Sequence, residues 1–587
     1  MFLTQNLVQN ILEVSLPTYA TLNSRGGDRM TFPDRHNPYS FDKFIEILKS
    51  VDFYADDVFL QRAVRHYCSD ELPELHDKLL RFSSKVSSRW RHLADRIARP
   101  EVRPYIEHYD AFNNRVDRIV RPQETTVMEK EIFSEGLFSS RTEPWDRFVK
   151  RYLLHEMGEA SITCPVACTE GLIALIQEFP ENRHPEVSDI LRHCTEGIEG
   201  DFGIGAQFMT EIQGGSDIPT NLLEAEPQGD HYTLFGSKFF CSAMHADYSV
   251  VTAKVSGTED VGTFVVPSWL PEDKTRERRN GCRINRLKWK LGTAELPTAE
   301  IEYDGAVAYA VGPTNRGVAN AVGIVLTLSR IAVATSSASA MTRCAREAVL
   351  YSQFREVFGK KIGEWPLAAG QLHDLTEAAQ RTTAGVFKVY DLFIRLGKKL
   401  QAGLESAEAL ETRKRRFNLR ELIILQKLVS AYETVDVVRK AMSVFGGHGV
   451  IEDFSSLPRL FRDATVNELW EGPRNVLLMQ VFRDIQRVSA WYPPEEFVRS
   501  VLDGAPEEVV EPLSANLKEF LIKPPLLELG LGAMERAAQW EKFCDTLFTS
   551  YQDQALNEIG RTPVLSRDKI STFIAWVGPY VQNLFSS

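Results

Sequence analysis

The stretch Ala464-Thr465-Val466-Asn467-Glu468-Leu469-Trp470-Glu471-Gly472-Pro473-Arg474-Asn475 places a carboxylate directly before a glycine. Glycine has no Cβ, so the backbone at Gly472 can come close to a ligand and bring the carboxylate of Glu471 with it. We predict that Glu471 is a catalytic base. A solvated glutamate before a helix-ending glycine would show the same triplet, so the prediction depends on the other motifs of the chain.

Four further motifs accompany this stretch. They are Gly446-Gly447-His448-Gly449, Arg462-Asp463-Ala464, Met209-Thr210-Glu211-Ile212-Gln213-Gly214-Gly215-Ser216-Asp217 and Arg355-Glu356-Val357-Phe358-Gly359. In this order and at these separations, they resemble the acyl-CoA dehydrogenase family of flavoproteins over about residues 110–485. Thr163-Cys164-Pro165-Val166-Ala167-Cys168-Thr169 and Asn114-Arg115-Val116-Asp117 resemble segments of its AidB-like branch. Taken alone, those two segments are typical of a helix start and a polar loop.

Periodicity divides the chain into four domains. Helical spacing of apolar residues predominates over 1–198, alternating and β-branched runs over 199–315, and long helical patterns over 316–490. A Tyr-Pro-Pro break then leads into an acidic, mainly helical extension over 491–587. The resemblance implies the same fold class: mainly α with an inserted β domain, built from a helical domain, a β-barrel domain and a C-terminal four-helix bundle.

Composition and charge exclude several functions. A length of 587 residues is too great for one compact core, and 43% hydrophobic with 25% charged residues is typical of a soluble globular protein. The net charge of −12 leaves no electrostatic footprint for nucleic acid, so we expect no nucleic-acid partner. The basic run Arg413-Lys414-Arg415-Arg416 is most typical of a solvated helix face. Gly203-Ile204-Gly205 lacks the third glycine of a nicotinamide-dinucleotide fingerprint.

The eight cysteines are scattered, without a C-x-x-C pair or a cluster at zinc spacing. We therefore expect free thiols in a reducing compartment and no metal site. The first 27 residues lack the features of a secretory or mitochondrial leader, and no apolar run approaches the roughly 18 residues of a membrane span. The expected location is the cytoplasm, with the mitochondrial matrix as second choice, and no membrane span is expected.

The loop from Met209 to Asp217 is the first predicted cofactor site. Gly214 and Gly215 expose backbone N–H groups suited to an electron-rich ring or a phosphate, although a simple turn between strands would look similar. The resemblance implies that the cofactor is FAD. It assigns the flavin ring to Met209 and Thr210, and the acyl-CoA as well as the flavin to Ser216.

The next strand carries the second predicted flavin contact. The family places an aromatic-apolar-hydroxyl triplet there, which corresponds to Phe240-Cys241-Ser242. Phe240 stands where the family usually has Trp, so a stacking face is kept and the indole N–H is lost. The resemblance therefore assigns Phe240 and Ser242 to the flavin. An ordinary buried strand is the alternative.

Two further groups of residues resemble the family's contacts to the diphosphate and adenine end of FAD. They are Arg355 with Phe358, and Gly446, Gly447 and Gly449. In the family these residues reach a flavin held mainly by the neighbouring subunit, so the resemblance implies a homo-oligomer, either a dimer or a tetramer. The family's usual Gln a few residues later is replaced by Pro366. A cation at a helix end and a tight glycine turn are the alternatives.

The resemblance also implies the reaction. Glu471 would remove the α-proton of an acyl-CoA thioester while the β-hydride moves to flavin N5, and the backbone N–H of Glu471 would polarise the thioester carbonyl. Desolvation beside Trp470 should raise the pKa of Glu471. Trp470 and Arg330 are the expected substrate contacts, and Gly472 and Asn475 are further expected cofactor contacts. In relatives whose base lies on a different helix, the corresponding position here is Ser329, which cannot act as the base.

The leading hypothesis is an FAD-dependent dehydrogenase of medium- to long-chain acyl-CoA that passes electrons to an electron-transfer flavoprotein. Pro473 departs from the family, which commonly has a hydroxyl residue after Glu-Gly. This departure favours an alternative: a flavin- and acyl-CoA-binding protein for stress response or lipid sequestration, with little turnover. An acyl-CoA oxidase is the other alternative, because the sequence does not determine whether oxygen reaches the flavin.

Overall fold

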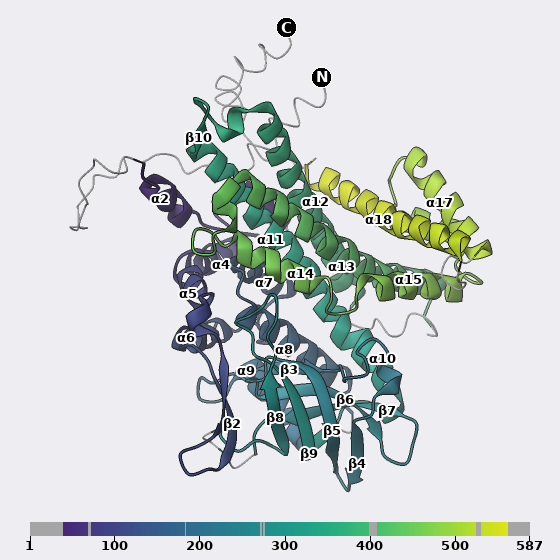
Figure 1. The fold of residues 1–587 in the computed structure, drawn as a ribbon. Helices are drawn as coiled ribbons and strands as arrows, with labels where there is room; N and C mark the ends of the chain where they lie inside the picture. The colour runs from purple at the N-terminus through teal and green to yellow at the C-terminus, as the bar shows by residue number, and fades with distance from the viewer. Residues whose placement is uncertain are drawn as a thin grey trace, which may run out of the picture.

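The computed structural model describes residues 39–560 apart from 69–71, 182, 271–272, 274–275, 398–407 and 524–529. Figure 1 shows the β domain at one end of the molecule, long helices at the other, and two C-terminal helices beside the long ones. This arrangement confirms the predicted fold class. Residues 1–38 and 561–587 lie outside the described residues, so the predictions made for them, including the one about a leader, are not tested by the structure.

The N-terminal part is helical, with one β-hairpin that the sequence pattern did not reveal. Its strands are β1 (Tyr105–Tyr109) and β2 (Arg115–Val120). The Asp110 carboxylate closes the turn by accepting the backbone N–H groups of Phe112 and Asn114, both at 2.8 Å. The segment expected as a polar loop is therefore partly strand. The helices of this part are α2 (Asp42–Ser50), α3 (Val58–Tyr67), α4 (Leu72–Lys85), α5 (Arg91–Ile97), α6 (Gln123–Phe133), α7 (Pro144–Met157), α8 (Ala160–Glu178) and α9 (Pro185–Glu196).

The β domain is a closed ring of strands with two strands attached. In the ring, β6 pairs with β4, β4 with β5, β5 with β9, β9 with β7, and β7 with β6 again, while β3 pairs with β6 and β8 with β9. Closure leaves no free edge in the ring, which is the arrangement expected of a small barrel. The strands are β3 (Gly205–Phe208), β4 (Glu224–Gln228), β5 (His231–Ser242), β6 (Tyr248–Val255), β7 (Val261–Pro267), β8 (Cys282–Leu287) and β9 (Thr298–Ala310).

The long helices form the bundle, entered through the short α10 (Gly317–Asn320). α11 (Leu326–Phe354) is its central member and packs against both α12 (Pro366–Leu396) and α13 (Leu410–Val444). Because almost every side chain of α11 is buried, its apolar and small residues lie on all faces of the helix. A short strand pair, β10 (Glu356–Val357) and β11 (Lys360–Lys361), separates α11 from α12. α14 (Leu457–Asn467) and α15 (Arg474–Val488) complete the domain.

The C-terminal extension packs on the bundle through its last helix. It consists of α16 (Pro494–Val501), α17 (Glu507–Ile522) and α18 (Leu531–Gly560), and α18 contacts α12 and α13. Trp540 of α18 is fully buried and donates its indole N–H to the carbonyl of Leu478 at 3.1 Å. The extension is therefore an integral part of the core.

Among the described residues, two helical segments are long and apolar enough to cross a membrane by length and composition: α8, and the run from Thr314 to Phe354. This differs from the expectation that no apolar run approaches the length of a membrane span. In the fold, 89% and 72% of their most apolar windows are buried against other elements. Core helices of this kind pass the same test as membrane spans, because both are apolar on all faces.

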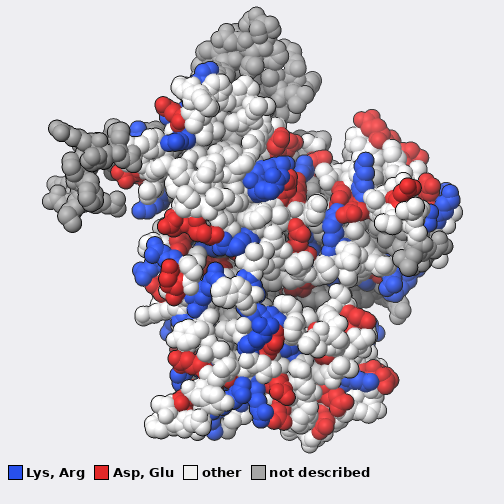
Figure 2. Space-filling view, viewed as in Figure 1, with Lys and Arg blue, Asp and Glu red and all other residues white. Residues whose placement is uncertain are grey.

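The charged surface matches the mixed composition. Figure 2 shows acidic and basic side chains interspersed on one face, without a continuous basic area on it. The basic run of α13 is largely paired: Lys414 contacts Glu411 and Glu496, and Arg416 contacts Glu408 at 2.9 Å.

Candidate active site

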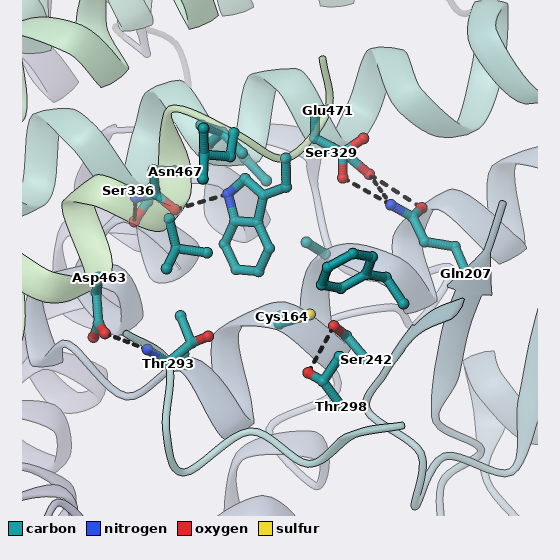
Figure 3. Close-up of a pocket in the computed structure, with 18 of the residues that line it drawn as sticks. Cys164, Gln207, Ser242, Thr293, Thr298, Ser329, Ser336, Asp463, Asn467 and Glu471 are labelled. Atoms are coloured by element: carbon teal, nitrogen blue, oxygen red, sulfur yellow. Dashed lines mark hydrogen bonds between the residues drawn. The ribbon is translucent and has the colours of Figure 1, made fainter. Parts of the chain in front are cut away.

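A cavity of about 1000 Å³ lies between the β domain, α8, α11, α14 and the loop that follows α14. Among the sequence-predicted residues, it collects those of the Trp-Glu-Gly stretch and those of the two β-domain motifs (Figure 3). The predicted residues that line it are Met209, Thr210, Ser216, Phe240, Ser242, Arg330, Trp470, Glu471 and Gly472.

The loop between α14 and α15 presents Glu471 through an uncommon backbone conformation. Glu471 has φ +59° and Gly472 has φ +103°, which is the left-handed region that side chains other than glycine rarely adopt. Lys427 of α13 holds the loop, since its ammonium donates to the carbonyls of Glu468 at 3.0 Å and Gly472 at 2.7 Å. Pro473 is the residue directly before α15, and its φ of −66° is the one that the proline ring imposes.

The Glu471 carboxylate faces a small polar network in the cavity wall. Gln207 of β3 donates its amide Nε2 to Glu471 Oε1 at 2.8 Å, and the Ser329 hydroxyl donates to Gln207 Oε1 at 3.2 Å. Burial raises the pKa of Glu471 to about 7, although the positive charges of Arg330 and Lys427 and the Gln207 hydrogen bond each lower it. A carboxylate with this pKa can take up a proton near neutral pH.

Arg330 lies beside the loop and not on a helix surface. Its guanidinium Nε donates to the carbonyl of Glu471 at 3.2 Å, and its Nη2 donates to Gln480 at 3.3 Å. Burial lowers the pKa of Arg330 to about 10, so it remains charged at neutral pH. Its position supports both the geometry of the loop and the ionised form of the base.

Trp470 is held with its ring towards the cavity. Its indole N–H donates to Asn467 Oδ1 at 2.9 Å, as Figure 3 shows, and Asn467 Nδ2 reaches Ser336 of α11 at 3.4 Å. Since the indole N–H is already paired with Asn467 at the end of α14, the ring contributes an apolar face to the cavity.

The opposite wall is formed by the β domain. The ring of Phe240 is half-exposed, with 48% of the residue accessible, and the Lys288 ammonium lies 4.3 Å from its centroid. The loop before it is compact, because a Cβ on Gly215 would lie 2.5 Å from Thr210 Oγ1. Glu211 anchors this loop through a buried ion pair with Lys238 of β5 at 2.8 Å. This wall and Trp470 line the same cavity.

The other sequence-predicted residues lie elsewhere. Arg355 and Phe358 follow the far end of α11, about 37 Å from Arg330 by helix rise. The glycine turn Gly446–Val450, with Gly446, Gly447 and Gly449, lies beside them, because Tyr351 and His448 hydrogen-bond at 2.9 Å. Asn475 is exposed on α15 and does not line the cavity. A ligand that bridges the cavity and the Arg355 region within one chain would have to span most of the bundle.

Sequence patterns did not identify three residues that hold the site together: Gln207, Lys427 and Asn467. Gln207 is a polar residue inside a short buried strand, two positions before Met209. A polar residue so close to a cofactor motif could have indicated a functional role. Lys427 lies among apolar residues of α13 and is almost fully buried, which is rare for a lysine. Asn467 lies within the Ala464–Asn475 stretch, and the sequence motif alone gave no indication of its role.

Fold and cavity together define an acyl-CoA dehydrogenase type of protein. The family model for the acyl-CoA dehydrogenase C-terminal domain matches residues 315–486, and the one for the middle domain matches residues 206–306. Acyl-CoA dehydrogenase family member 11 of Caenorhabditis elegans is 30% identical over 484 residues, which cover 78% of this chain and 72% of that protein. Putative acyl-CoA dehydrogenase AidB of Escherichia coli (strain K12) is 30% identical over 412 residues, 66% of this chain and 70% of that protein.

The solved structures show the same fold. Caenorhabditis elegans ACDH-11, in complex with C11-CoA, superposes with a TM-score of 0.70 at 24% identity and covers 97% of this chain and 99% of that one. The chain belongs to the acyl-CoA dehydrogenase family, a family of FAD-dependent flavoprotein oxidoreductases, and is an enzyme of that family.

Proposed function

We propose that this protein catalyses the α,β-dehydrogenation of a medium- to long-chain acyl-CoA, with FAD as cofactor and Glu471 as base. The observation that carries the proposal is the Glu471 carboxylate, which lines the cavity with a pKa raised to about 7 by burial. An ordinary surface glutamate has a pKa near 4.3 and is a far weaker base. The position and the basicity of Glu471 both suit proton abstraction.

Glu471 removes the proton from the carbon next to the thioester carbonyl. The abstracted proton resides on the Glu471 carboxyl, and negative charge develops on the thioester oxygen. We assign the backbone N–H of Glu471 as one donor to that oxygen, because donors aimed at developing charge provide much of the stabilisation in enolate chemistry. Arg330 and Lys427 keep Glu471 ionised before the reaction, since each positive charge lowers its pKa.

The residues of the β-domain wall fit a flavin. They offer the half-exposed ring of Phe240, the hydroxyls of Thr210 and Ser242, and the compact glycine turn before Ser216. We assign the flavin ring to this wall, with Met209, Trp470 and Gly472 as further neighbours. FAD bound there would supply the acceptor for the β-hydride at its N5 atom.

The acyl chain is assigned to the part of the cavity between α8 and α11. Its lining includes Ala167 on α8 and Ala332, Val333 and Ala340 on α11. Between Ser329 and Ala340 this wall spans about 16 Å by helix rise, which supports a medium to long chain. ACDH-11 was solved in complex with C11-CoA, which agrees with this range.

We further propose a homo-oligomer. Arg355, Phe358 and the glycine turn 446–450 lie too far from the cavity of their own chain to share its flavin, so the proposed partner for their contacts is the flavin of a neighbouring subunit. Phe358 is 93% exposed, as expected of a residue that a second chain covers. An electron-transfer flavoprotein is the proposed acceptor. The cytoplasm is the proposed location and the mitochondrial matrix the second choice, since all eight cysteines are free.

The second candidate function is acyl-CoA sequestration with little turnover. Pro473 favours it, because proline has neither the hydroxyl nor the N–H that the family commonly offers at this position. The intact Glu471 and its raised pKa favour the dehydrogenase.

The test is the visible spectrum of the purified protein under anaerobic conditions, before and after addition of acyl-CoAs of graded chain length. If the protein is a dehydrogenase, the oxidised-flavin band should bleach to an extent that depends on chain length, and this bleaching should be lost in Glu471→Gln. A band that shifts without bleaching would support sequestration instead. A protein that takes up no flavin even when reconstituted with FAD would overturn the cofactor assignment. Fast reoxidation of the bleached protein in air would support an oxidase.

A further inference from the structure

The channel assigned to the acyl chain has two chemically different ends. α8 and α11 run along it in opposite directions. At one end, Cys168 and Ser329 lie near Gln207 and Glu471. At the other end, Arg343 of α11 donates to the carbonyl of Met157, just before α8, at 2.6 Å. The channel therefore leads away from the base towards the start of α8.

The far end is polar, although an unsubstituted alkyl chain would end there. The side chains that line it come from α7, the start of α8, the loop 289–298 and α14. Figure 3 shows Asp463 and Thr293 on the opposite side of the cavity from Glu471. The polar residues of the far end are His155, Glu159, Lys290, Thr293 and Asp463.

Glu159 is the central residue of this end. It is fully buried and lies directly before α8. Its Oε1 atom caps the helix by accepting the backbone N–H of Ser161 at 3.0 Å and the Ser161 hydroxyl at 2.5 Å. Its Oε2 atom has no hydrogen-bond partner among the described residues. Helix capping thus explains one oxygen and leaves the other without a role, and a buried oxygen without a hydrogen bond destabilises the fold.

A second buried glutamate lies behind Glu159. Glu295 accepts the backbone N–H of Ala160 at 3.0 Å and does not line the cavity. Burial, and then the charge of Glu295, raise the pKa of Glu159 well above its usual range. Asp463 is affected in the same way and has a pKa of about 7. Burial therefore favours the neutral form of both carboxyl groups.

The cations at this end donate to protein groups, although the Nε of Arg459 has no hydrogen-bond partner among the described residues. The Lys290 ammonium donates to Thr293 Oγ1 at 2.9 Å, the Leu296 carbonyl at 3.0 Å and Thr298 Oγ1 at 2.8 Å. An ammonium group has three donors, so Lys290 has none left for a ligand. Arg459, whose charge also acts on Glu159 and Asp463, donates to the carbonyl of Ala94 at 2.9 Å.

We infer that this end binds a hydroxyl group, so that the preferred substrate is an acyl-CoA whose chain carries a hydroxyl at or next to its last carbon. Glu159 is the assigned partner of that hydroxyl, with Asp463 beside it. The inference rests on the proposed function, because it takes the channel from Glu471 to Glu159 as the acyl site.

The charge of the far end selects a neutral hydroxyl over other end groups. A carboxylate would face Glu159, Glu295 and Asp463 and would find no donor left on Lys290. An ammonium group would be repelled by Lys290 and Arg459. A hydroxyl both donates and accepts, so it satisfies the free oxygen of Glu159 whether that carboxyl is protonated or ionised. A methyl end would leave this oxygen unpaired.

The test compares two ligands of equal length by isothermal titration calorimetry on the FAD-reconstituted protein: ω-hydroxydodecanoyl-CoA and tridecanoyl-CoA, which differ by a hydroxyl in place of a methyl group. We expect the hydroxylated ligand to bind about tenfold more tightly. In Glu159→Met, which replaces the carboxyl by an apolar side chain of similar length, this ratio should fall to about one or reverse. Circular dichroism and thermal melting would verify that the variant folds.

Glu295→Gln is the matched control. It removes a carboxylate from the same buried group without touching the cavity lining, so the tenfold ratio should remain within about twofold. Tighter binding of tridecanoyl-CoA by the wild type would overturn the inference, and this comparison does not require any variant to fold. It would leave the proposed function standing, provided that tridecanoyl-CoA still bleaches the flavin. Binding of neither ligand would overturn the proposed function and the inference with it.

Discussion

Arg474 and Asp545 join the loop of the base to the C-terminal extension. Arg474 lies three residues after Glu471, at the start of α15, and its Nη2 donates to both carboxylate oxygens of Asp545 on α18 at 2.7 Å each. Its Nε also donates to Glu541, one helical turn earlier on α18. The extension therefore takes part in fixing the position of Glu471.

Asp545→Asn should slow flavin reduction by acyl-CoA roughly fivefold without loss of flavin. The substitution weakens one of the contacts that hold Arg474, and small displacements of a catalytic group reduce the rate sharply. The pair is partly exposed, with Asp545 at 40% side-chain exposure, so its effect on the free energy of unfolding should stay below about 1 kcal/mol. Anaerobic stopped-flow measurement of flavin reduction tests this. Glu535→Gln, an exposed change on the same helix, is the control and should leave the rate unchanged.

The rate of flavin reduction should rise with pH through about 7 and then level off. The raised pKa of Glu471 means that the carboxylate, which is the active base, is fully formed only above this pH. Arg330→Gln removes a charge that lowers this pKa, so the midpoint should move to higher pH. A rate independent of pH between about 5 and 9, with unchanged substrate binding, would contradict the assignment of Glu471.

Gly472→Ala should destabilise the protein by about 1–2 kcal/mol and strongly reduce the rate of flavin reduction. Gly472 has φ +103°, and an added Cβ would lie 2.8 Å from Leu477 Cδ2, so the loop that carries Glu471 would have to shift. Urea unfolding and stopped-flow spectroscopy measure the two effects. A variant with wild-type stability and rate would show that the loop tolerates the side chain.

Gly447→Ala should leave the free energy of unfolding within about 0.5 kcal/mol of the wild type, because its Cβ would meet nothing within 4 Å. In the proposed oligomer that open space faces the flavin of another subunit. The variant should therefore bind FAD more weakly, by about tenfold in the dissociation constant, measured by fluorescence titration of the apoprotein. Unchanged FAD affinity would remove Gly447 from the cofactor site.

Phe358→Ser should weaken self-association and lower the flavin content of the purified protein. Phe358 is 93% exposed at φ +52°, so a serine costs the isolated fold little, whereas an interface would lose a buried aromatic ring. Analytical ultracentrifugation together with the flavin-to-protein ratio measures both. Leu367→Ser, at another exposed apolar position of the bundle with 92% exposure, is the comparison. A fully associated, fully flavinated Phe358→Ser protein would contradict the assigned role.

Much of the fold and part of the site could be predicted from local patterns. Helical spacing identified the long helices, alternation identified the β domain, and the motifs identified Glu471 together with the β-domain residues that line the same cavity. These features are local, because a helix or strand records its buried face in the order of its own residues. The hairpin of β1 and β2 was missed. One of its contacts is long-range, since Asp117 accepts the backbone N–H of Ile284 on β8, and no local pattern records such a contact.

The sequence by itself determined the fold class, the family and the identity of the candidate base. Only the tertiary structure decided that Gln207, Lys427 and Arg330 surround that base, that Glu159 lies at the far end of its channel, and that α18 holds Arg474. Each of these contacts joins residues more than 40 positions apart in the chain. Such contacts depend on how whole helices and strands pack, and the same packing removes water from Glu471 and so raises its pKa.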